Sequence, residues 1–150
     1  MRQARVMAWG AVLLWTAGTG AAWAQLDQAR AEPNLEKRSK LALENAEAML
    51  KEAREAYRAG NTDTAAKVKE LQESVELSYR SLTETGKNPR KSPKYFKQAE
   101  MTTRELGRKL DDFQREMSYS DRASLDAVKA KIQQVHDDLL TGLMEGRKKK

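Results

Sequence analysis

The sequence predicts an all-α protein, an up-down-up-down four-helix bundle that follows a cleaved signal peptide. Apolar residues recur at steps of three and four along four long segments, and no segment alternates polar and apolar residues as a half-buried strand does. Short connections that contain glycine or proline separate these segments. Neighbouring helices are therefore expected to run antiparallel and to bury their apolar stripes together.

The first 24 residues have the layout of a signal peptide. Arg2 and Arg5 form a positively charged start, residues 6–17 are almost wholly apolar, and residues 22–24 fit the A-x-A pattern of cleavage sites. An uncleaved membrane anchor is the alternative, but it requires about 20 apolar residues, more than this stretch provides. The chain has no cysteine, which argues against a lipoprotein. We expect cleavage after Ala24 and export to a periplasmic or extracellular location.

The chain that remains is divided by its composition. Residues 25–33 are polar, lack a helical period and contain Pro33, so we expect a flexible leader there. The bundle is expected to occupy residues 34–146, with helices at about 35–59, 63–85, 93–117 and 121–145, and a basic tail is expected at 147–150.

The helix ends are marked by residues that cap or stop helices. Asn34 suits the start of the first helix, Gly60 and Gly86 are typical of the ends of the first two, and Ser92 followed by Pro93 is typical of the start of the third. The predicted core positions, helix by helix, are Leu35, Ser39, Ala42, Leu43, Ala46, Met49, Leu50, Ala53, Ala56 and Tyr57; Ala65, Val68, Leu71 or Gln72, Val75, Ser78 or Tyr79, and Leu82; Phe96, Ala99, Thr103, Leu106, Leu110, Phe113 and Met117; and Leu125, Val128, Ile132, Val135, Leu139 and Leu143.

The outer faces of the helices are rich in charge. Acidic residues precede basic ones by four positions at several places, for example Glu36 before Lys40 and Asp111 before Arg115, which is typical of a solvated helix face. Gly107 interrupts the third helix, where glycine costs about 1 kcal/mol relative to alanine. It indicates a close approach of another helix or a bound ligand, and we favour close packing.

The net charge of +6 does not lie in the fold itself. Arg2 and Arg5 belong to the predicted signal peptide, and Arg147, Lys148, Lys149 and Lys150 form the tail, so residues 25–146 carry a formal charge of zero. The basic isoelectric point therefore reflects the signal peptide and the tail rather than the helical part of the chain.

One internal segment is also basic. It holds five cations and no anion within eleven residues, interleaved with Tyr95 and Phe96. In an up-down-up-down bundle this connection lies at the same end as the C-terminus, so we expect one basic pole. An anionic polymer or lipid surface of the cell envelope is the partner this charge favours, and export argues against nucleic acid. Solubility alone is the competing interpretation. The predicted anion-binding residues are Lys87, Arg90, Lys91, Lys94, Lys97, Arg147, Lys148, Lys149 and Lys150.

The sequence contains no recognisable catalytic constellation, so we expect a protein that is not an enzyme and that holds no cofactor. It has no cysteine, no Gly-x-Ser-x-Gly turn and no glycine-rich phosphate loop. His136 is the only histidine and a weak candidate metal ligand, because the helical positions three and four residues away offer no carboxylate. A haem or metal carrier that uses the bundle interior around His136, with Met49 as a second haem ligand, is the alternative function.

Four apolar residues lie off the main stripes and raise the prospect of a partner surface. They are Leu41, Leu77, Met101 and Leu140, and their convergence would favour a homodimer or the docking of another envelope protein.

The sequence thus predicts an exported, non-enzymatic binding or scaffold protein of the cell envelope that acts through its basic pole.

Overall fold

The computed structural model describes residues 20–146, and within them all regular structure is helical, with five α-helices and no strand. The predicted all-α class is confirmed. Most of the predicted signal peptide, residues 1–19, and the basic tail, residues 147–150, lie outside the described residues.

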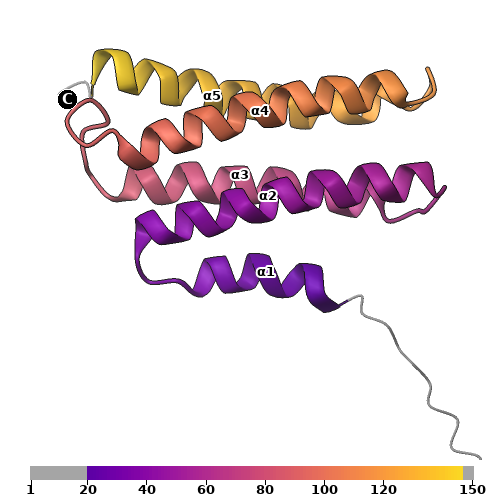
Figure 1. Cartoon of the computed structure of the whole chain (residues 1–150), viewed down its shortest axis with the longest axis horizontal. Coiled ribbons are helices and arrows are strands. Elements are labelled where there is room, and N and C mark those ends of the chain that lie inside the picture. The colour runs from indigo at the N-terminus through magenta and orange to yellow at the C-terminus, as the bar shows by residue number, and fades with distance from the viewer. Residues whose placement is uncertain (1–19, 147–150) are drawn as a thin grey trace, which may run out of the picture.

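Four long helices form most of the molecule. They are α2 (Leu35–Arg58), α3 (Thr64–Glu84), α4 (Lys94–Glu116) and α5 (Asp126–Glu145), and a short 3₁₀ helix, η1 (Arg122–Leu125), precedes α5. Consecutive helices run in opposite directions with roughly aligned axes (Figure 1). Among these four helices, the most extensive packing is between α2 and α3, followed by α4 with α5, and α2 with α4. The last helix begins about five residues later than predicted because η1 takes its first turn.

The start of α2 and the end of α3 have the caps that the sequence predicts. Oδ1 of Asn34 accepts a hydrogen bond from the backbone N–H of Lys37 at 2.9 Å, which is the predicted cap of α2. Gly86 ends α3 with a φ of 69°, a left-handed conformation that glycine adopts without steric cost. The predicted cap of α4 is wrong, because Pro93 rather than Ser92 immediately precedes this helix and no side chain caps it. The helices α3 and α5 also begin without a side-chain cap.

The core lies between the four long helices. Most of the predicted stripe positions are buried, and the largest side chains without exposed surface include Met49, Leu71, Leu106, Phe113 and Ile132. Burial of these side chains on facing stripes contributes about 1.5–3 kcal/mol for each large residue. The 3.6-residue period was therefore sufficient to identify the core face of each long helix.

The prediction of a flexible leader is wrong for residues 25–31. These residues belong to α1 (Gly20–Ala31), which runs through the predicted cleavage point and packs against α2 and α3. Leu26 and Ala29 are 1% and 0% exposed and form a second apolar cluster with Ala42 and Leu77. So short a helix is marginal on its own, so its conformation depends on this docking rather than on local propensity.

The same cluster explains two of the four apolar residues that lay off the predicted stripes. Leu77 is buried beneath α1, and Leu41 packs against the same cluster. Met101 and Leu140 remain 52% and 39% exposed, on α4 and α5. The four residues therefore do not share one outward surface.

None of the helices within residues 20–146 has the length and apolar character needed to cross a membrane.

A polar seam joins α2 to α3. Asn45 and Glu70 are only 2% and 4% exposed, and Nδ2 of Asn45 donates to Oε1 of Glu70 at 3.1 Å and to Oγ of Ser74 at 2.8 Å. The hydroxyls of Ser39 and Ser78 form a further hydrogen bond at 2.7 Å. Oδ1 of Asn45 has no hydrogen-bond partner among the described residues. Small side chains on both helices allow the two backbones to approach closely along this seam.

Candidate anion-binding end of the molecule

The predicted basic segment lies at one end of the molecule, against the last turns of α5. A β-carbon built at Gly142 would lie 3.2 Å from Cγ of Pro89, and one at Gly146 would lie 3.2 Å from Oδ1 of Asn88 and 3.6 Å from Cβ of Arg90. The connection between α3 and α4 and the end of α5 meet at the left of Figure 1. We call the surface formed by residues 87–97 and the last two turns of α5 the basic end.

Two of the five cations in residues 87–97 have internal partners. Nζ of Lys87 lies 2.6 Å from Oε1 of Glu36, which ties the connection to the first turn of α2. Nζ of Lys94 lies 5.1 Å from the ring centroid of Tyr95, a weak cation–π contact. The negative charge of Glu36, which sequence reasoning had placed beside Lys40, therefore offsets part of the basic segment.

The other three cations, Arg90, Lys91 and Lys97, are exposed and form no ion pair with the described residues. Their charges are available to an anion from solution, and an exposed cation near an anionic surface contributes about 1 kcal/mol at low salt. The tail cations predicted to join them, Arg147 to Lys150, follow Gly146 directly but lie outside the described residues.

A cleft of about 280 Å³ opens at the basic end, between α3, the connection, the start of α4 and α5. Its apolar walls include Phe96, Leu139 and Pro89, and its polar groups are Thr83, Lys87 and Asp138. Gly142 and Gly146 also line it, and because they lack side chains the cleft stays open along α5. Sequence reasoning missed this cleft, since it arises only where these four segments meet.

Tyr79 forms part of the cleft wall. Burial raises the pKa of its phenol, and the nearby negative charge of Asp138 raises it further. Tyr79 is therefore neutral at physiological pH and offers a hydroxyl to the cleft rather than a charge.

His136 has a partner that its own helix could not reveal. Nδ1 of His136 lies 3.6 Å from Oε1 of Glu100 on α4, and Glu100 also contacts Arg104 at 3.5 Å. Among the described residues, no group of three or more histidine, cysteine, aspartate or glutamate side chains is placed to hold a metal ion. Met49, the other predicted haem ligand, packs in the main core.

Gly107 does not mark a close helix approach. A β-carbon built there would have no neighbour within 4 Å, so the expected close packing is wrong. Gly107 instead lines a shallow cleft of about 210 Å³ between α4 and α5, together with Arg104, Lys129 and His136.

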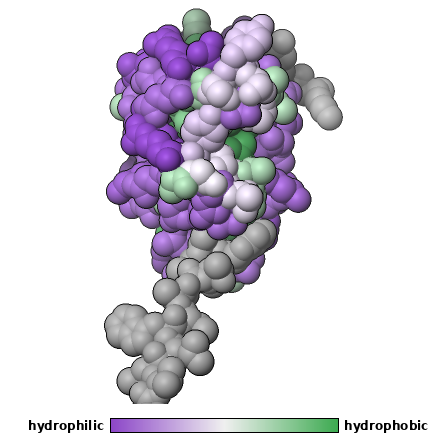
Figure 2. Space-filling model, turned by 90° about the vertical axis from the view of Figure 1, so that its right-hand side faces the viewer, coloured by the Kyte–Doolittle hydropathy of each residue, from purple (hydrophilic) through white to green (hydrophobic). Residues whose placement is uncertain are grey.

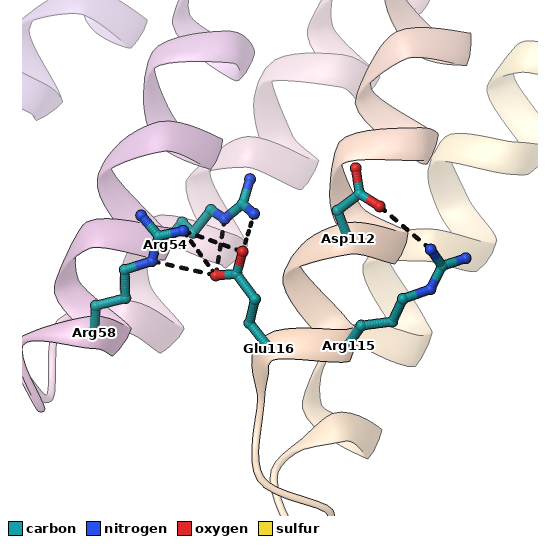
Figure 3. Close-up of polar contacts among 5 residues, drawn as sticks. All are labelled: Arg54, Arg58, Asp112, Arg115 and Glu116. Atoms are coloured by element: carbon teal, nitrogen blue, oxygen red, sulfur yellow. Dashed lines mark hydrogen bonds and ion pairs between the residues drawn. The ribbon is translucent and has the colours of Figure 1, made fainter.

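The opposite end of the molecule is held by ion pairs. Glu116 at the end of α4 receives the guanidinium groups of Arg54 and Arg58 from α2, while Arg115 contacts Asp112 (Figure 3). The two arginines lower the pKa of Glu116 to about 2, with the hydrogen bond from Arg54 as the main cause.

A second set of hydrogen bonds fastens this end. The hydroxyl of Tyr57 donates to Oδ2 of Asp121 at 2.9 Å and accepts from the backbone N–H of Ser118 at 2.9 Å. Figure 2, which faces this end, shows a largely hydrophilic surface with scattered hydrophobic residues. The cations at this end, Arg54, Arg58 and Arg115, form ion pairs within the protein. Arg90, Lys91 and Lys97 form none with the described residues.

Comparison of the chain with protein-family models, with curated proteins and with solved structures found no match.

Proposed function

We propose that this protein is an exported, non-enzymatic binding or scaffold protein of the cell envelope, and that its basic end contacts anionic polymers or lipids there. In this proposal α2 to α5 act as a rigid four-helix bundle that presents the basic end. The observation that carries it is the set of exposed cations Arg90, Lys91 and Lys97, which have no ion-pair partner among the described residues.

The contrast with the rest of the surface supports this proposal. Elsewhere many basic side chains lie within 4 Å of a carboxylate, as Arg54 and Arg58 do with Glu116. A group of cations left without such neighbours raises the local positive potential and attracts polyanions. The tail residues Arg147 to Lys150 follow the last helix and add to this potential in the proposal.

Export rests on the layout of residues 1–24, and the position of α1 is compatible with it. Leu26 and Ala29, the buried residues within the described part of α1 at 25–31, both follow the proposed cleavage point at Ala24. Removal of residues 1–24 would therefore leave the contacts of Leu26 and Ala29 with α2 and α3 in place. Mass spectrometry of the protein recovered from its native host tests this step, and an intact residue 1 on the exported protein would overturn cleavage.

Binding to vesicles that contain phosphatidylglycerol, and to soluble polyphosphate, tests the basic end. The triple substitution Arg90→Glu, Lys91→Glu and Lys97→Glu is expected to weaken both interactions on the order of 100-fold at low salt, because each lost cation contributes about 1 kcal/mol. Deletion of residues 147–150 is expected to weaken them further.

A matched control applies the same charge change elsewhere. Lys51→Glu, Lys69→Glu and Arg108→Glu reverse exposed cations in the parts of α2, α3 and α4 remote from the basic end. If both triple variants bind equally weakly, only net charge matters and a specific basic end is refuted. Binding that does not weaken as salt rises from about 0.05 M to about 0.5 M would refute the electrostatic mechanism.

A further inference from the structure

We infer that the cleft at the basic end binds the apolar chain of an anionic amphiphile, whose charged group is held by Arg90 and Lys91. This inference deepens the proposed function, on which it rests, by naming the ligand class of the same surface. It concerns a molecule with both an alkyl chain and an anionic head group, rather than a purely ionic polymer.

The walls of the cleft favour an alkyl chain. Phe96 and Leu139 belong to the buried core, so the cleft reaches from the surface down to that core. Its volume of about 280 Å³ lies near the lower limit of about 300 Å³ for small-molecule sites. An alkyl chain placed there would exchange water contact for contact with Phe96, Leu139 and the ring of Tyr79, which is the favourable part of hydrophobic binding.

The charges place the head group at one end of the cleft. Two wall residues mark the ends of the cleft: Asp138 on α5, and Gly146, which directly follows α5 eight positions later, a rise of about 12 Å. Asp138 is negative, so an anionic head group would avoid that end. At the other end Gly146 adjoins Arg90, which has no ion-pair partner among the described residues. Charge complementarity therefore orients an amphiphile with its anion towards Arg90 and its chain towards Tyr79.

A soluble polyanion would use only part of this arrangement. It would contact the exposed cations but leave the apolar walls wet, and it would gain nothing from the depth of the cleft. The observation that favours an amphiphile is that the apolar cleft ends beside Arg90, a cation without an ion-pair partner among the described residues.

A series of alkyl phosphates below their micellar concentrations tests the inference by calorimetry on the purified protein. If the chain enters the cleft, affinity rises by up to about fourfold for each added methylene, the equivalent of 0.8 kcal/mol, and stops rising once the cleft is full. Octyl phosphate is expected to bind at least about tenfold more tightly than inorganic phosphate and than octyl glucoside, which has the chain without the charge.

A cleft-filling variant separates this inference from the proposed function. Thr83 is exposed on α3 and lines the cleft, so Thr83→Trp would occupy it without removing a core side chain. The matched control is Ala66→Trp, at an exposed position near the other end of α3. We expect Thr83→Trp to reduce the affinity for octyl phosphate about tenfold or more and to leave polyphosphate binding unchanged, and Ala66→Trp to change neither.

Three outcomes would overturn the inference. One is equal affinity for octyl phosphate and inorganic phosphate, one is an affinity that does not depend on chain length, and one is full binding of octyl phosphate by Thr83→Trp. In each case continued binding of polyphosphate would leave the proposed function standing. Polyphosphate binding by the triple variant of Arg90, Lys91 and Lys97 tests the proposed function and not this inference. Loss of that binding supports the proposed function, and full retention overturns it.

Discussion

The polar seam between α2 and α3 predicts an unusual pattern of stability changes. Asn45 and Glu70 are nearly inaccessible, and the carboxyl group of Glu70 accepts a 3.1 Å hydrogen bond from Nδ2 of Asn45. Asn45→Leu removes this donor and keeps a branched side chain of similar shape. A buried polar group left without a partner costs about 1–3 kcal/mol, and more when it is charged, so we expect a loss of about 3 kcal/mol.

The second substitution should restore most of that loss. Oδ1 of Asn45 already lacks a hydrogen-bond partner among the described residues. The double variant Asn45→Leu, Glu70→Met therefore removes both an unpaired oxygen and a buried carboxyl group and fills the space with apolar atoms. Replacing both partners by apolar groups is nearly neutral or stabilising in such cases. We expect the double variant to lie within about 1 kcal/mol of the parent, a coupling of about 2–3 kcal/mol.

Urea unfolding followed by circular dichroism at pH 7 measures the four members of this double-mutant cycle. Ser74 keeps its own hydrogen bond, because its Oγ donates to the carbonyl of Glu70 at 2.8 Å, and so it adds no new unpaired donor in any variant. Additive losses in the double variant would refute the reasoning, since they would show that Asn45 and Glu70 act independently. A change in the urea m-value would instead reveal that the two helices no longer pack as in the parent.

Two further predictions concern the ends of the fold. Glu116 has its pKa lowered to about 2 from 4.5 by Arg54 and Arg58, so its stabilising contribution is complete above pH 4.5 and is lost as the pH falls towards 2. Glu116→Gln should therefore flatten the acid dependence of the urea midpoint between these pH values, and an unchanged slope would contradict the pairing. Leu26→Ala should release α1, because Leu26 is 1% exposed and its burial against Leu77 is worth about 1.5–3 kcal/mol. Hydrogen exchange should then rise in residues 25–31 alone, and uniform acceleration along the chain would show instead that α1 unfolds only with the whole protein.

Much of the fold could be predicted because helical periodicity is local. The apolar steps of three and four located the long helices to within a few residues, and Asn34 and Gly86 marked ends that the structure has at those places. The helix at residues 25–31 was not predicted, because its two buried side chains give too short a pattern to recognise. Their helix depends on α2 and α3, which the local sequence does not contain.

Polar residues on the core stripes were the least predictable. Asn45 stands three and four residues from Ala42 and Met49, so its position on the buried face was visible, but its polarity argued for exposure. Glu70 and Glu100 are also buried, each beside a partner from another helix. A buried polar group is tolerated when a partner satisfies it. The partners of Asn45 and Glu70 lie on different helices, so spacing within one helix does not reveal them.

The sequence likewise predicted some features of the basic end and not others. The run of cations in residues 87–97 is a feature of composition, and antiparallel helices joined by short connections bring that run to the end of α5. The pairing of Lys87 with Glu36, the freedom of Arg90 and Lys91 from ion pairs with the described residues, and the cleft beside them were not foreseen.

The sequence by itself determined the helical class, the extents of the long helices, the core stripes and the neutral charge of residues 25–146, because each of these depends on neighbours along the chain. Only the tertiary structure decided that α1 docks on α2 and α3, that His136 faces Glu100 and that an apolar cleft opens beside Arg90. These features depend on side chains from different helices meeting at particular rotations, and helix rotation is fixed by packing across the core rather than by the period of any one helix.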